Sequence, residues 1–346
     1  MSAAAAAALP PLHRIALVDL TTPPLTTLGA TLLPLLLPLV LLRLAAMFAV
    51  LSAWVCLLWL LQRRPRRGED GDAPRFHCYP LVRTSTFVAS RLALAALGFR
   101  VRVTGAEHVQ EAYRRRTATA IVCNHCSYFD QFVIGASCGS YFAVARHDVA
   151  ALPIIGSVLR AFGYAAVVRK GDNAPAGGDS RHSAPPGSSV TTLLAERARR
   201  TGEWKRHPPL LVFPEGTCAS GHALLQFKSG GFVSGQPVLP VAIRLRAGAL
   251  NPAWVWRLRP TRAAWAARLP TEAIHLMRVL SRPLNVAEVT VLPPYTPSDE
   301  EQRDAALYAA NVRHAIATAL GVPTEHCGTY DDAKAFERTA RGGSAS

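Results

Sequence analysis

His125 and Asp130, separated by four residues, are the side chains in this sequence best placed to form a catalytic base. They lie in the sequence Cys-Asn-His-Cys-Ser-Tyr-Phe-Asp, which follows a strand-like run. A carboxylate that accepts the Nδ1 proton of an imidazole fixes its tautomer, so that Nε2 can take a proton from a hydroxyl. Ser127 fits the N-cap of a following helix and Asp130 its N3 position, a capping-box pattern that turns the two side chains toward each other. The pair predicts a general base that acts on a hydroxyl; the alternative is a loop histidine beside a structural helix cap.

A second polar segment follows another strand-like run, Leu210–Phe213, and reads Pro-Glu-Gly-Thr. In α/β proteins, ligands gather at the carboxyl ends of the strands, so the two segments are expected to meet. Gly216 and Thr217 offer backbone and hydroxyl donors for a phosphate or an oxyanion, and Glu215 can order a hydroxyl or a basic neighbour. The alternative is a turn between two elements.

A third segment, Gly135–Gly139, satisfies the G-x-S-x-G pattern of serine hydrolases. That pattern needs a strand before the serine and a helix after it. Here the order is reversed, because the helix begun near Ser127 leads in and the strand-like run Tyr141–Ala145 leads out. Hydrolysis through Ser137 is therefore kept as a remote alternative.

The charge of the chain indicates which partners it binds, and its cysteines indicate its compartment. The 346 residues include 38 Lys and Arg against 23 Asp and Glu, a formal charge of +15, which attracts anionic partners. No nucleic-acid module accompanies the scattered arginines, so we expect a phospholipid membrane and no nucleic acid. Seven cysteines, an odd number, favour a reducing compartment. Cys123 and Cys126 lack a second ligand pair, so we expect buried thiols and no metal.

The first 62 residues predict an arm and a membrane anchor. Residues 1–27 resemble a mobile arm and lack the basic start of a secretory signal. Residues 28–62 are almost wholly apolar, and the charge-free stretch Leu44–Leu61 would make roughly 27 Å of helix.

Two arrangements fit this anchor. One is a single tilted span; the other is a re-entrant hairpin with Arg43 near its turn, which keeps a charge away from mid-bilayer, where it costs about 2.5–3.5 kcal/mol. A signal peptide or a buried core helix is the alternative. Four arginines follow at once, at positions 63, 64, 66 and 67, so the positive-inside tendency places the remaining chain in the cytosol.

The remaining sequence predicts one α/β domain. Residues 63–99 are expected to form a linker and an amphipathic helix, residues 100–325 the domain, and residues 326–346 a tail. Residues 172–189, rich in Gly, Pro and Ser, predict a surface insertion. Short β-rich runs alternate with helical stretches, which predicts a mixed or mostly parallel sheet flanked by helices. The expected strands are Arg100–Thr104, Ala118–Cys123, Tyr141–Ala145, Tyr164–Arg169, Leu210–Phe213, Val238–Arg244 and Ala287–Leu292; the expected helices are 127–137, 151–161, 190–201 and 301–319.

Four segments in order resemble the glycerolipid acyltransferase family. They are Asn124–Asp130, Gly163–Arg169, Phe213–Thr217 and Val238–Ala242. The sequence is more similar to the lysophosphatidylcholine acyltransferase branch, through Phe227–Phe232 and through the stretches 295–301 and 307–313. The resemblance implies a glycerol-3-phosphate acyltransferase-like fold and acyl-CoA-dependent reacylation of a lysophospholipid. It also implies the endoplasmic reticulum or a related internal membrane, and no cofactor besides the co-substrate acyl-CoA.

Carried onto this sequence, the resemblance makes His125 the general base and Asp130 its orienting partner. It implies that Arg169 and the segment Glu215–Thr217 bind the acceptor phosphate, and that Arg146 contacts CoA or lipid phosphate. Hydroxyl attack on the thioester would then be direct.

The sequence also departs from that branch. The segment Ala219–His222 stands where an Asn-Arg pair is usual, which leaves the acceptor headgroup open: lysophosphatidylcholine is expected, and lysophosphatidic acid is the alternative. No EF-hand loop occurs, because the acidic pairs near residues 70 and 331 lack its ligand spacing. A non-catalytic membrane scaffold is a further alternative, but the presence of both His125 and Asp130 disfavours it.

Overall fold

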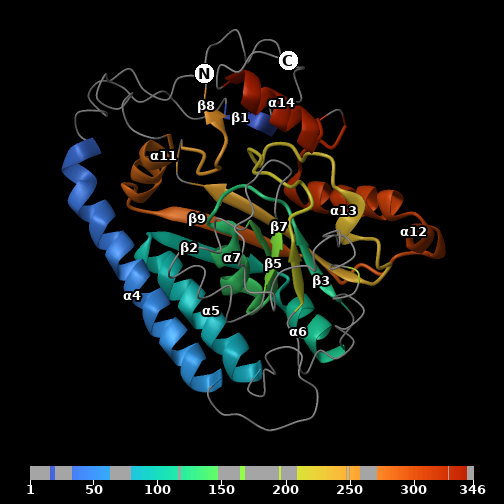
Figure 1. Ribbon diagram of the computed structural model, residues 1–346, viewed down its shortest axis with the longest axis horizontal. Coiled ribbons are helices and arrows are strands. Elements are labelled where there is room, and N and C mark those ends of the chain that lie inside the picture. Colours follow the sequence, from blue (N-terminus) through green and yellow to red (C-terminus); the bar gives the residue numbers. More distant parts are fainter. Residues whose placement is uncertain are drawn as a thin grey trace, which may run out of the picture.

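A computed structural model of the chain shows a layered α/β domain with long helices packed along one side (Figure 1). The described residues are 16–19, 33–62, 79–115, 118–146, 164–167, 195, 209–246, 248, 250–257, 271–325 and 327–340.

Within these residues, seven strands form one sheet in the order β2-β9-β7-β3-β6-β4-β5. Neighbouring strands are parallel except β7 and β9, which are antiparallel, so the expected mixed sheet is confirmed. The strands are β2 (Phe99–Thr104), β3 (Ala120–Cys123), β4 (Phe142–Arg146), β5 (Tyr164–Val167), β6 (Leu210–Val212), β7 (Val238–Arg246) and β9 (Asn285–Val291).

The central strands form because their short apolar runs are covered on both faces. On β3, Ile121 and Cys123 join the cluster beneath the long helices, whereas Ala120 and Val122 join the cluster on the opposite face. The first layer contains α4 (Leu37–Gln62), α5 (Tyr79–Ala96), α6 (Ala106–Arg115), α7 (Asp130–Cys138) and α11 (Thr271–Leu280); the second contains α12 (Asp299–Arg303) and α13 (Ala305–Leu320). The sequence analysis did not predict α6 or α11.

The single helix expected over residues 301–319 is two helices. Ser298 and Glu301 form a capping box at the start of α12. Asp304 then adopts an extended conformation and its carboxylate accepts hydrogen bonds from the backbone N–H groups of Ala306 and Leu307, which starts α13. A side chain that can cap a helix favours a break over continuation.

The anchor segment contains one uninterrupted helix, so the hairpin with a turn at Arg43 is wrong. A short 3-10 helix, η1 (Leu33–Leu36), leads into α4, which continues through Arg43. The guanidinium of Arg43 donates hydrogen bonds to the carbonyl oxygens of Leu280 (2.7 Å), Arg282 (2.6 Å) and Pro283 (3.3 Å). These carbonyls lie at the C-terminal end of α11 and just after it. The guanidinium of Arg43, whose charge would be costly in lipid, therefore finds its hydrogen-bond acceptors in the domain.

Gly98 makes room for this contact. It has a positive φ of 80°, and a Cβ placed there would lie 2.6 Å from Nη1 of Arg43. A glycine is therefore required at this turn both by its backbone and by its neighbour.

The two long faces of α4 have different surroundings. Val40, Met47, Leu51, Trp54 and Leu58 are buried, spaced as one helical face. Several large apolar residues of α4 are exposed, among them Leu41, Leu42, Leu57, Trp59 and Leu60. Within the described residues, Pro34–Leu61 is the one helix long and apolar enough to cross a membrane.

Parts of the segments expected to be an arm and a tail have regular secondary structure among the described residues. Strand β1 (Val18–Asp19) pairs with β8 (Trp256–Arg257), and α14 (Tyr330–Ala340) lies beside them (Figure 1). Ala16, Leu17, Ala333 and Phe336 share a buried cluster with residues 219–225. The helices expected over 151–161 and 190–201, and the insertion 172–189, lie outside the described residues, apart from Ala195.

Replacing Arg43 by glutamine is expected to lower the free energy of unfolding by about 1–3 kcal/mol, because the carbonyls at the end of α11 lose their donor. Denaturant unfolding of the detergent-solubilised chain measures the change. Arg102→Gln, an equal loss of charge at an exposed position of β2, is the control. Equal stability of the two variants would contradict the structural role of Arg43.

Candidate active site

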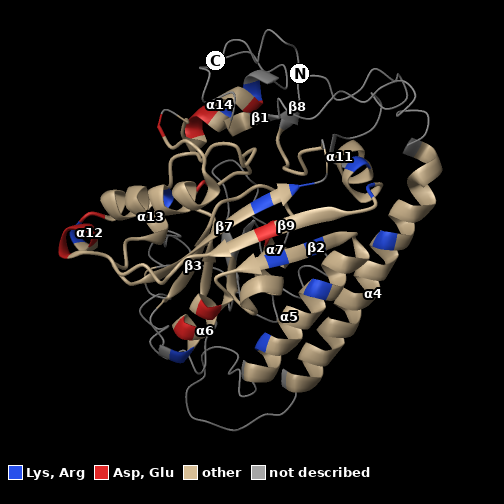
Figure 2. Cartoon of the chain, turned by 180° about the vertical axis from the view of Figure 1, so that it is seen from behind, with Lys and Arg blue, Asp and Glu red and all other residues tan. Residues whose placement is uncertain are grey.

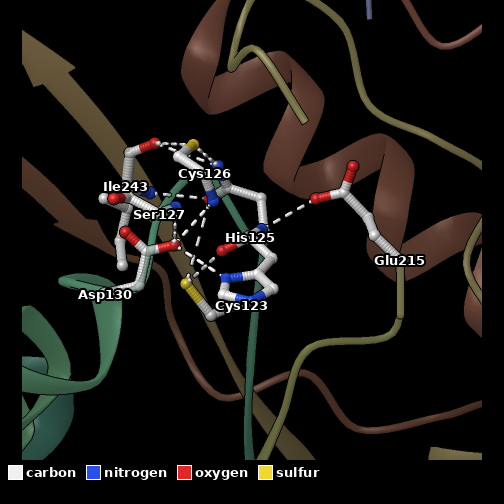
Figure 3. A network of polar contacts seen from close by, with 8 residues as sticks. Cys123, His125, Cys126, Ser127, Asp130, Glu215 and Ile243 are labelled. Atoms are coloured by element: carbon white, nitrogen blue, oxygen red, sulfur yellow. Dashed lines mark hydrogen bonds and ion pairs between the residues drawn. The ribbon is translucent and has the colours of Figure 1, made fainter. Parts of the chain in front are cut away.

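Asp130 is the acceptor around which the first segment is folded (Figure 3). Its Oδ2 accepts hydrogen bonds from Nδ1 of His125 (2.9 Å) and from the backbone N–H groups of Cys126 (2.6 Å) and Ser127 (2.8 Å). The predicted contact between His125 and Asp130 is therefore confirmed. Because the nitrogen that faces the carboxylate carries the proton, Nε2 of the neutral ring is an acceptor.

The predicted capping box is only half formed. Helix α7 begins at Asp130 with Phe129 as N-cap, and no side chain caps it. The carboxylate of Asp130 does accept from Ser127 N–H, but the hydroxyl of Ser127 is buried and finds no partner among the described residues. The reason is that one carboxylate oxygen gathers three donors, which holds residues 126–129 in a loop instead of a first helical turn.

Asn124 is a site residue that the sequence reading did not assign. Its Oδ1 accepts from the backbone N–H of Ile243 (2.8 Å), and its Nδ2 donates to the carbonyl of the same residue (3.0 Å). The fully buried side chain thus replaces a strand neighbour where β3 ends and joins that end to β7. Its position in the segment Asn124–Asp130, which resembles the acyltransferase family, was the available signal.

Glu215 positions His125 from the second segment (Figure 3). Its two carboxylate oxygens accept from the backbone N–H groups of His125 (2.8 Å) and Leu225 (3.0 Å), and the side chain is fully buried. Both oxygens thus accept from the protein backbone, and the expected contact between this carboxylate and the substrate stays a prediction. Burial raises the pKa of Glu215 to about 7, although the two backbone donors act to lower it.

The ring of His125 contacts Phe213 as well as Asp130 and remains partly accessible. It stacks on Phe213 with ring centroids 4.3 Å apart, and 20% of the side chain is exposed. Burial acts to lower the pKa of His125, but the charges and hydrogen bonds of Cys218 and Asp130 raise it well above its ordinary value. A ring with a raised pKa is a stronger base once it has lost its proton.

The residues after Glu215 form the accessible wall of the site. Gly216 and Thr217 are partly exposed, and Gly216 has a positive φ of 71°. A Cβ on Gly216 would lie 3.1 Å from Nζ of Lys228, whose ammonium lies 3.3 Å from the ring centroid of Tyr330. Lys228, which we did not predict as a site residue, thus brings a cation beside Gly216 and Thr217. Its place in the segment Phe227–Phe232, already similar to relatives, was the available signal.

The sheet explains why these segments meet. Strands β3 and β6 are parallel neighbours, so the residues that follow them lie at the same edge. Arg146 ends β4, which is parallel to β6, and its backbone therefore reaches that edge too. Its side chain and the whole of Arg169 lie outside the described residues.

The other reactive side chains have structural contacts. Ser137 lies inside α7, where its hydroxyl donates to the carbonyl of Val133 (2.7 Å), and strand β4 follows the helix. The strand-serine-helix order of a hydrolase is therefore absent at this position. Burial raises the pKa of Cys123 and Cys126, which keeps both thiols protonated. Within the described residues, no group of three or more His, Cys, Asp or Glu side chains is arranged for a metal ion.

Comparison with known proteins identifies an acyltransferase domain in the chain. Residues 100–244 match the family model described as Acyltransferase. The chain is 36% identical over 239 residues to the lysophospholipid acyltransferase LPCAT4 of Homo sapiens, which covers 69% of this chain and 40% of that protein. It is 32% identical to the lysophosphatidylcholine acyltransferase of Drosophila melanogaster (67% and 39%) and 33% identical to the lysophospholipid acyltransferase LPEAT1 of Arabidopsis thaliana (61% and 47%). The chain thus matches less than half the length of these relatives.

A solved structure shows the same fold. The 1-acyl-sn-glycerophosphate (LPA) acyltransferase PlsC of Thermotoga maritima aligns with a TM-score of 0.51 and 17% sequence identity. The alignment covers 84% of this chain and 98% of that one.

Replacing Asp130 by asparagine is expected to lower the pKa of His125. A carboxylate stabilises the imidazolium and raises the pKa, so a neutral amide in its place lets the proton leave at lower pH. The measurement is an NMR titration of the chain labelled at histidine, with Asp299→Asn, an exposed carboxyl at the start of α12, as control. An unchanged or raised pKa in Asp130→Asn would show that Asp130 does not set the charge of the ring.

Proposed function

This chain belongs to the acyltransferase family through its residues 100–244, and from that premise we propose that it transfers an acyl group from acyl-CoA to the free hydroxyl of a lysophospholipid, with lysophosphatidylcholine as acceptor. The observation that carries the proposal is the contact between Asp130 and Nδ1 of His125 at the edge of the sheet, beside the accessible Gly216 and Thr217.

The proposed mechanism is a direct transfer. Nε2 of His125 takes the proton of the acceptor hydroxyl while its oxygen attacks the thioester carbonyl of acyl-CoA. The C–S bond then breaks, the proton passes to the leaving sulfur, and the products are CoA and the acylated phospholipid. Asp130 stabilises the imidazolium that forms between these steps. No acyl-enzyme and no bound cofactor are required.

The proposed phosphate contacts come from Gly216, Thr217 and Lys228. The backbone and hydroxyl of the first two are partly exposed, and the ammonium of Lys228 is beside them. Arg146 and Arg169 are proposed to add charge, as the family resemblance implies. A phosphate bound by cations and N–H donors near the base would hold the lysolipid hydroxyl in reach of His125.

The choice of headgroup rests on the relatives: the Drosophila protein is named a lysophosphatidylcholine acyltransferase, and the other two are named lysophospholipid acyltransferases. The segment that departs from the branch is largely structural here. Ala219 and Ser220 are buried, and the carbonyl of Ser220 accepts from Nδ2 of Asn251 (2.9 Å). Only His222 in this segment is exposed, so the missing Asn-Arg pair is replaced by packing rather than by new charges.

We place the protein in the endoplasmic reticulum or a related internal membrane, with the domain on the cytosolic side. The exposed leucines of α4 support contact with lipid, and the arginines after residue 62 support a cytosolic domain. Since the buried face of α4 packs on α5, we propose that one side of the helix faces lipid and the other the domain.

Replacing His125 by alanine is expected to reduce turnover about 10²–10⁴-fold, the usual contribution of a general base. The assay follows conversion of lysophosphatidylcholine with acyl-CoA by membranes that hold equal amounts of each protein. His314→Ala, at an exposed position of α13, is the control. Equal activity of wild type and His125→Ala would refute the role of His125.

A panel of acceptors decides the headgroup. We expect a higher kcat/KM for lysophosphatidylcholine than for lysophosphatidylethanolamine or lysophosphatidic acid, measured with several acyl-CoAs. A preference for lysophosphatidic acid would refute the headgroup assignment and leave the transfer reaction intact.

A separate experiment tests hydrolysis. If a fluorophosphonate probe labels wild type but not Ser137→Ala, and wild type transfers no acyl group, the result would support hydrolysis through Ser137.

A further inference from the structure

A cleft of about 360 Å³ lies at the opposite end of α7 from His125. It is bounded by α5, by the start of α6, by Val103 of β2 and by residues 137–139 at the end of α7. Asp130 starts α7 and Cys138 ends it, so at 1.5 Å per residue the cleft is roughly 12 Å of helix away from the catalytic pair. It is a separate feature of the molecule.

Two arginines belong to the part of α5 that lines this cleft, and α5 carries blue segments in Figure 2. Arg83 and Arg91 line the cleft, and no carboxylate is among the lining residues that the structure describes. The partners that the described residues give these arginines are neutral. The guanidinium of Arg83 lies 3.7 Å from the ring centroid of Tyr113, and that of Arg91 lies over Phe87 and donates to the carbonyl of Ala136 (3.1 Å).

The fold also makes room for Arg83. Gly139 has a positive φ of 87°, and a Cβ placed there would lie 2.7 Å from Cγ of Arg83. The absence of a side chain at the end of α7 therefore lets the arginine stem lie against the backbone and hold its guanidinium in the cleft. A guanidinium group whose contacts are neutral is able to bind a phosphate.

The surface beside the cleft is apolar. Leu81, Val88 and Leu92 are exposed and lie on one stripe of α5, about 80° round the helix from Arg91 and about 160° from Arg83. Beyond that stripe, Ser85 accepts a hydrogen bond from the indole of Trp54 on α4 (3.3 Å). Around α5, the contact with α4 is therefore followed by the apolar stripe and then by the cationic cleft. The stripe and the cleft are neighbours, as the acyl chains and the headgroup are in a lipid.

We propose that this cleft binds the phosphate of an anionic phospholipid from the membrane that holds α4, while its acyl chains lie along Leu81, Val88 and Leu92. A phosphate alone would not use the apolar stripe, and an apolar ligand alone would not use the arginines. The site would seat α5 at the depth of the headgroups and would be independent of the acyl acceptor site.

The test measures binding of dioctanoyl phosphatidylserine to the full chain in an uncharged detergent, with dioctanoyl phosphatidylcholine and inorganic phosphate as comparison probes. Wild type is expected to bind the serine lipid at least about tenfold more tightly than either comparison probe, as charge-assisted contacts allow. The double variant Arg83→Gln, Arg91→Gln is expected to lose this preference.

A matched control removes the same charge elsewhere. Arg100→Gln, Arg102→Gln changes two exposed arginines of β2 outside the cleft and is expected to bind within about twofold of wild type, as mutations of distant groups do. Thr84→Trp fills the cleft and keeps both arginines, so it tests the site should the double variant unfold.

Three results would overturn the proposal. One is unchanged binding of phosphatidylserine by the double variant or, if that variant is unfolded, by Thr84→Trp. Another is an equal loss in the β2 control, which would show attraction by overall charge. The third is equally tight binding of inorganic phosphate, which would make the cleft a site for free anions.

Discussion

The active edge of this domain depends on one constraint: the backbone N–H groups between β3 and α7 are buried, outside any helix or strand, and must find acceptors. Two carboxylates supply them. Asp130 takes the amides of Cys126 and Ser127, and Glu215 takes the amide of His125. The carbonyls of the same loop accept from Ala219 and Trp254. The imidazole is thus fixed through its own backbone as well as through its ring.

Asp130 and Glu215 have different roles in this arrangement. Asp130 contacts the ring and therefore affects its charge, whereas Glu215 contacts only backbone and affects its place. The difference follows from burial and donor geometry, since each oxygen of Glu215 accepts from a backbone N–H group. The cations expected near a phosphate must then come from other residues, and Lys228 is the one that the described structure places beside Gly216.

The sequence predicts those features that depend on local pattern. Short apolar runs gave the strands, and the spacing of His125 and Asp130 gave their contact. Features that depend on distant partners were missed or wrong. Ser127 has the type and spacing of an N-cap, but the three donors on Asp130 override it. The role of Asn124 depends on Ile243, which is 119 residues away. From the sequence, Arg43 was interpreted as a break in an apolar helix, because its partners, the carbonyls at and after the end of α11, are more than 200 residues away.

That joint between Arg43 and the end of α11 also bears on how such proteins vary. An anchor connected only by a linker is interchangeable, because any apolar helix of sufficient length holds a domain at a membrane. Here the anchor carries a specific donor, the domain carries its acceptors, and Gly98 leaves the space between them. A change in the donor, the acceptors or Gly98 disturbs the contact that all three form, so anchor and domain are expected to be inherited as a unit. The height of the active edge above the lipid is then a property of the fold.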